Sequence, residues 1–99
     1  MVRDSMAKIT RSQAEQIETA YNEIRDISAQ YPDVFVRKHS DDTYNPMTTA
    51  EYNDGNIQMY VDLDGVRVTM RNVNFCRIKD DGLMIGGTGG LITVDISDE

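Results

Sequence analysis

The sequence predicts an α+β fold: one N-terminal helix, at about residues 11–30, followed by a four- to five-stranded antiparallel sheet that curls or closes into a small β-barrel. Three observations carry this prediction. Apolar residues recur every three or four positions before Pro32, they alternate with polar residues from Ile57 onward, and Asp-Gly or glycine-rich stretches separate the later segments. The 99 residues suffice for a single domain, with residues 1–9 as an N-terminal arm.

The predicted helix has a start signal, an apolar face and a stop signal. Thr10 and Gln13 match a capping box, and Ser12 with Glu15 offers a second register. The apolar face consists of Ile17, Ala20, Tyr21, Ile24, Ile27 and Tyr31. Pro32 disfavours helical geometry at the residue before it, so we expect the helix to end there.

After the helix, a short strand is expected at residues 34–38 and a long polar loop at residues 40–55. The loop contains the turn-forming pairs Asn45-Pro46 and Asp54-Gly55. A loop of this length in a compact domain is often functional, and it is equally well explained as a solvated connection.

A hairpin is predicted from two alternating runs, at 57–63 and 66–71, that flank an Asp-Gly pair at 64–65. The alternation then changes phase, because apolar residues occupy odd positions at Val73 and even positions again at Cys76. Such a break inside a strand-forming run indicates a β-bulge or a sharp bend, which is how a sheet curls.

Two more strands, at 83–85 and 91–96, flank a glycine turn at 86–90. The order of a helix and then a meander with one long bent strand is similar to that of Sm-like barrels. The resemblance is one of outline: the motif residues of that family are not evident, and no RNA-binding residue is carried over from it.

The charge is unevenly distributed along the chain. The net charge is −7, yet residues 67–79 hold four cations and no carboxylate, whereas 40–66 hold six carboxylates and 80–99 hold five, both without Lys or Arg. One interpretation of the basic strand is ordinary cross-strand pairing of Arg67 and Arg71 with Asp62 and Asp95.

The alternative interpretation is a groove for a small anion such as a nucleotide, formed by the basic strand and the glycine turn of a homo-oligomer. Arginine suits phosphate because its planar fork matches two oxygens, and a glycine turn can present backbone N–H groups to an anion. The candidate residues are Arg67, Arg71, Arg77, Gly86, Gly87, Thr88 and Gly89. The basic strand could also contact an acidic segment of a second copy.

The leading functional prediction is a small acidic binding module without enzymatic activity, an inhibitor that engages a basic surface of a protein partner. Its carboxylates would take the place of a nucleic-acid backbone on that surface. In size and charge it is similar to phage-encoded anti-defence proteins. The candidate contact residues are Asp41, Asp42, Tyr44, Glu51, Tyr52 and Asp54.

Other classes of protein are disfavoured. The sequence pI of about 4.5 argues against direct binding of nucleic acid or of anionic membranes. His39 and Cys76 are the only residues of their types, so no metal cluster, cofactor or catalytic pair is expected. The sequence has no apolar run long enough for a signal peptide or a membrane span, so we expect a cytoplasmic protein.

Overall fold

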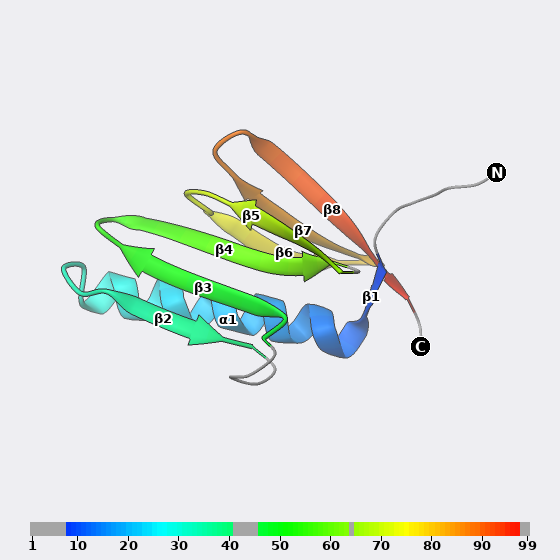
Figure 1. The fold of residues 1–99 in the computed structure, drawn as a ribbon, viewed down its shortest axis with the longest axis horizontal. Helices are drawn as coiled ribbons and strands as arrows, with labels where there is room; N and C mark the ends of the chain where they lie inside the picture. The colour runs from blue at the N-terminus through cyan, green and yellow to red at the C-terminus, as the bar shows by residue number, and fades with distance from the viewer. Residues whose placement is uncertain (1–7, 41–45, 64, 98–99) are drawn as a thin grey trace.

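The computed structural model describes residues 8–40, 46–63 and 65–97 and confirms the α+β class. It has one helix and eight strands (Figure 1). In chain order they are β1 (Lys8–Thr10), α1 (Arg11–Gln30), β2 (Val36–His39), β3 (Thr48–Asn53), β4 (Asn56–Leu63), β5 (Val66–Met70), β6 (Phe75–Lys79), β7 (Gly82–Gly87) and β8 (Gly90–Ser97).

The strands form two four-stranded sheets, in the orders β2-β3-β4-β5 and β1-β8-β7-β6. All neighbours are antiparallel except β1 and β8, which run parallel and bring the first and last strands side by side at one end (Figure 1). The described strands do not close into a barrel. The similarity to Sm-like barrels therefore ends at the order of elements, and the curled sheet is the form that the fold takes.

The helix begins and ends where the sequence predicts. Thr10 is the N-cap: its Oγ1 accepts from the backbone N–H of Gln13, 3.1 Å away, while Gln13 Oε1 accepts from the backbone N–H of Thr10 at 2.9 Å. This reciprocal pair satisfies two donors that the first turn leaves free. At the other end, Tyr31 leaves helical geometry and its N–H donates to the carbonyl oxygen of Ile27.

One face of α1 forms the centre of a core shared by both sheets. Ile17 and Ile24 are fully buried, and α1 packs against β2 and β3 of one sheet and β6 of the other (Figure 1). Each sheet contributes rows of buried and partly buried residues that face each other across paired strands. These rows include Ala50 with Met59 and Met70, Cys76 with Ile85 and Ile92, and Ile78 with Leu83 and Val94.

The predicted break in alternation is the point where the chain passes from one sheet to the other. Asn72 has φ +51°, and the N–H of Val73 still donates to the carbonyl oxygen of Ile57 on β4. The N–H of Asn74 already donates to the carbonyl oxygen of Gly86 on β7. The single bent strand expected from the sequence is thus two strands, β5 and β6, that lie in different sheets.

Two other expectations need correction. Strand β3 occupies much of the segment 40–55, which the sequence predicts to be a polar loop. Thr48 and Thr49 are buried there although they count as polar in a hydrophobic pattern, and the Asp54-Gly55 pair closes the β3–β4 hairpin with positive φ at both residues. In the N-terminal arm, residues 8 and 9 belong to β1, which pairs with β8.

Gly87 lies where the two sheets meet. A Cβ atom there would overlap the carbonyl oxygen of Arg71 and come within 3.1 Å of the carbonyl oxygen of Asn72. The backbone of the crossing segment therefore approaches β7 as closely as it does because residue 87 has no side chain.

We expect Gly87→Ala to lower the free energy of unfolding by about 1–3 kcal/mol, because backbone atoms must move to admit the methyl group. Gly86→Ala is the matched control, since its Cβ would meet the flexible Leu91 side chain at 3.2 Å, Phe75 Cβ at 3.5 Å and, at an ordinary contact distance of 3.9 Å, the carbonyl oxygen of Gly90. Urea denaturation of both variants measures the difference. Equal losses in the two variants would show that the crossing segment has room to adjust.

Candidate functional site

The six residues predicted to contact a partner fall into different environments. Asp41, Asp42 and Tyr44 lie outside the described residues. Glu51 accepts from Arg37 Nη2 at 2.9 Å and from Arg37 Nε at 3.0 Å, so its charge is matched within the sheet by a β2–β3 pair.

Tyr52 is part of the core and Asp54 is at the surface. Tyr52 is 6% exposed, and its hydroxyl donates to the carbonyl oxygen of Pro32 at 2.8 Å. This bond fastens the segment after α1 to β3. Asp54 is exposed in the β3–β4 turn with φ +55°.

Asp54 lines an open hollow of about 640 Å³ between the β3–β4 turn and the segment that follows α1. We call it the acidic hollow, and its lining residues are Pro32, Asp33, Tyr52, Asn53, Asp54 and Gly55. Asp33 and Asp54 are both exposed, and neither Lys nor Arg is among the lining residues. The hollow therefore presents two carboxylates from segments that are far apart in the sequence.

Three large apolar side chains are exposed beside Pro32 and Asp33. The exposed fractions are 58% for Tyr31, 40% for Val34 and 54% for Phe35. The sequence does not reveal this group, because Tyr31 fits the apolar face of the helix and Val34 and Phe35 fit a strand. The missed signal is a group of large apolar residues on both sides of a helix-ending proline, where neither the helical nor the strand period continues.

The arginines predicted to bind an anion do not share one site. Arg67 lies opposite Asp62, but Asp62 Oδ1 accepts from the N–H of Gly65, and Arg67 Nη2 donates to the carbonyl oxygen of Pro46. The cross-strand ion pair expected between these two residues is thus not formed. Asp95, the other expected partner, lies in the second sheet opposite Gly82.

The glycine turn is a tight hairpin. Gly86 and Gly87 end β7, Gly90 begins β8, and only Thr88 and Gly89 form the turn. Of the three arginines, Arg71 is the one whose backbone contacts this turn, because its carbonyl oxygen accepts from the N–H of Thr88 at 3.1 Å. Asn72 Nδ2 also donates to Thr88 Oγ1 at 2.8 Å.

Arg77 lies on β6 with its guanidinium over the ring of Phe75, 6.0 Å from the centroid. It lines a pocket between β6 and α1 that also contains Arg25, a helix residue that the sequence analysis did not select. Arg77 therefore shares a pocket with a cation from the helix and not with Arg67 or Arg71.

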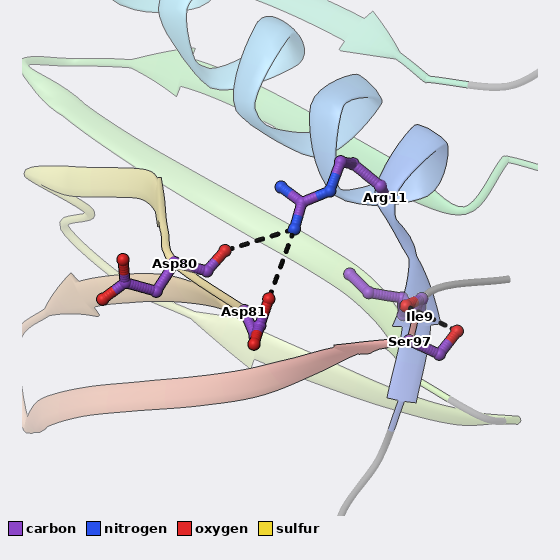
Figure 2. A network of polar contacts seen from close by, with 5 residues as sticks. All are labelled: Ile9, Arg11, Asp80, Asp81 and Ser97. Atoms are coloured by element: carbon purple, nitrogen blue, oxygen red, sulfur yellow. Dashed lines mark hydrogen bonds and ion pairs between the residues drawn. The ribbon is translucent and has the colours of Figure 1, made fainter.

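The remaining ion pairs hold elements together. Arg11 Nη2 lies 3.6 Å from Asp81 Oδ1 and donates to the carbonyl oxygen of Asp80 at 3.2 Å, which ties the start of α1 to the β6–β7 turn (Figure 2). Lys38 of β2 pairs with Glu23 of α1 at 3.0 Å. These pairs are exposed, so each contributes about 1 kcal/mol or less.

The described residues contain no group of three or more His, Cys, Asp or Glu side chains that could hold a metal ion. His39 Nδ1 lies 3.0 Å from Thr49 Oγ1, a contact across the β2–β3 pair. Within the described part of the chain, no helix is both long enough and apolar enough to span a membrane.

No protein-family model, no curated protein sequence and no solved structure matches this chain. The candidate sites therefore rest on the geometry of the chain itself. Two surfaces stand out among the described residues: the acidic hollow with its exposed apolar neighbours, and the pocket that contains Arg25 and Arg77.

Cys76 is a core residue with a strongly perturbed ionisation. Burial raises the pKa of its thiol from 9.0 to about 12, and the nearby charge of Glu18 adds to the shift. A thiol with so high a pKa stays protonated at neutral pH, which makes it a poor nucleophile.

We expect this thiol to make the protein less stable at alkaline pH. Between pH 9 and 12 the unfolded state loses its thiol proton first, so the free energy of unfolding falls by up to about 1.4 kcal/mol per pH unit. Below pH 8 the thiol has no effect on the pH dependence of stability, because it is protonated in both the folded and the unfolded state. Urea denaturation from pH 7 to 11 should show a steeper decline for the wild type than for Cys76→Ala, and parallel curves would contradict the assignment.

Proposed function

We propose that the protein is a small acidic binding module that engages a basic surface on a protein partner through the acidic hollow and the apolar residues beside it. The observation that carries the proposal is the exposure of Tyr31, Val34 and Phe35 within five residues, next to the carboxylates of Asp33 and Asp54. Scattered exposed apolar residues are ordinary, whereas a local cluster of them marks an interaction site.

The cluster has the composition of a protein interface. Aromatic side chains supply much of the binding energy at interfaces, and they do so best near the centre of a patch with a polar rim. Here the aromatic residues are Tyr31 and Phe35, and the rim includes Asp33 and Asp54. The rim is negative overall, because the cation at Arg37 is paired with Glu51, so a surface rich in Lys and Arg is its complementary partner.

The segment that carries the cluster is held in place before any partner binds. The N–H of Val34 donates to the carbonyl oxygen of Tyr31 at 3.3 Å, and the hydroxyl of Tyr52 fixes Pro32. The guanidinium of Arg37 covers the ring of Phe35 at 5.4 Å. A surface ordered in this way loses less entropy on binding than a loose loop.

A basic partner surface is also what nucleic acid binds. An acidic module seated on such a surface would block access to it, and this is the sense in which the protein could act as an inhibitor. The proposed partner therefore presents a surface that is rich in Lys and Arg and has apolar pockets for the rings of Tyr31 and Phe35.

The test uses a defined probe, a fluorescein-labelled eight-residue peptide of alternating arginine and leucine. We expect the wild type to bind it, and the variant D33N/D54N to bind about two- to tenfold more weakly because two exposed charge contacts are lost. The loss should shrink as salt is raised, since salt screens these contacts. Fluorescence anisotropy at two salt concentrations measures both effects.

Two matched controls accompany this experiment. The variant E15Q/D80N removes the same charge from two exposed residues outside the acidic hollow and should bind as the wild type does. For the apolar part, Tyr31→Ser should weaken binding and Leu91→Ser should not, although both residues are more than half exposed. Equal losses in E15Q/D80N and D33N/D54N would place the peptide on the general acidic surface and overturn the proposed site.

A further inference from the structure

A small pocket lies between α1 and the edge strand β6, with a volume of about 320 Å³. We call it the arginine pocket; its lining includes Tyr21, Asn22 and Arg25 from α1 and Asn74, Phe75 and Arg77 from the β6 side. This volume lies at the lower end of the range for small-molecule sites, which is about 300–1,000 Å³. It contains two cations and two carboxamides in a protein of net charge −7.

The two arginines are positioned by aromatic rings. Arg25 lies over Tyr21 at 5.7 Å from the ring centroid, and Arg77 lies over Phe75 at 6.0 Å. In the described part of the chain the ion pairs involve Arg11, Arg37 and Lys38, and neither Arg25 nor Arg77 takes part. Stacking orients a guanidinium while N–H donors at its edge stay available to a ligand. Arg25 also interacts with the Tyr21 hydroxyl, which offsets part of the rise that burial causes in the pKa of Tyr21, so its remaining donors are those available to a ligand.

Glu18, the one carboxylate among the lining residues, is engaged with the backbone of β6. Glu18 Oε2 accepts from the backbone N–H of Ile78 at 3.3 Å, which satisfies a donor on the exposed edge of β6. With Glu18 at −1 and the two arginines at +2, the ionised side chains that line the pocket sum to +1. The only other ionisable groups among them are Tyr21 and Cys76. Both are neutral at pH 7, since their ordinary pKa values already lie above 7 and burial raises the pKa of each further.

We propose that the arginine pocket binds a small phosphate monoester, with Arg25 and Arg77 as the two clamps on the phosphate oxygens. The side-chain amides of Asn22 and Asn74 supply neutral donors at the same pocket. Arginine suits this ligand because its fork matches two phosphate oxygens, and charge-assisted hydrogen bonds of this kind are among the strongest in proteins. The site shares no residue with the acidic hollow, so its test is independent of the proposed function.

The experiment titrates the folded protein, in phosphate-free buffer, with inorganic phosphate, adenosine 5′-monophosphate and adenosine. Binding is followed by the NMR signals of the arginine Nε–H groups and by thermal stabilisation. We expect both phosphate compounds to shift the signals of Arg25 and Arg77, while those of Arg67 and Arg71 stay in place. Adenosine, which lacks the phosphate, should shift none of them.

Three variants carry the same loss of one charge. Arg25→Gln and Arg77→Gln should each weaken binding of adenosine 5′-monophosphate about tenfold or more, because each removes charged hydrogen bonds to the phosphate. Arg71→Gln, which changes an exposed arginine just after β5 and outside the pocket, should bind as the wild type does. Circular dichroism confirms that each variant is folded before it is titrated.

Several results would overturn the proposal. No response of the wild type to either phosphate compound would remove the site. An equal loss in Arg71→Gln would show general attraction of an anion to arginine rather than a pocket. Binding of adenosine as tight as that of its monophosphate would show that the phosphate group is not what the pocket recognises.

Discussion

The burial of one helix face between two sheets is the constraint on which the rest of the structure depends. Ile17 and Ile24 have no solvent exposure, and the inner residues of both sheets have no other described helix to cover them. Each sheet of four short strands is too small to bury its own apolar face. Both sheets therefore have to pack against α1, and the chain has to turn sharply where it passes from one sheet to the other.

The bend at residues 71–74 decides which side chains become neighbours. There the backbone leaves β4, crosses close to Gly87 and joins β7. As a result, arginines that are close in sequence separate in space: Arg71 remains beside the glycine turn, and Arg77 moves to the helix. The same crossing places Arg77 in a pocket that Arg25 also lines, so one corner of the backbone separates Arg77 from Arg71 and brings it beside the helix.

The charges of the protein divide into those that hold the fold together and those left at the surface. Arg11, Arg37 and Lys38 pair with carboxylates and connect α1, β2, β3 and the β6–β7 turn. The carboxylates at Asp33 and Asp54 remain exposed beside the aromatic residues. An acidic end and a local cationic pocket coexist because the net charge is a sum over the whole chain, whereas a bound ion interacts mainly with the charges within about 10 Å of it.

The sequence by itself determined the helix from cap to stop, the hairpin around Asp-Gly, the phase break near Val73 and the excess of acidic residues, because each is written in neighbouring residues. Strand β3 could not be recognised in the sequence, because its buried threonines count as polar in a hydrophobic pattern. Nor could the sequence show that Tyr52 lies in the core while Tyr31 and Phe35 are exposed. Only the tertiary structure brought Asp33 to Asp54 and Arg25 to Arg77. Such pairings follow from how two sheets share one helix, and burial of that shared face is a property of the whole chain rather than of any local pattern.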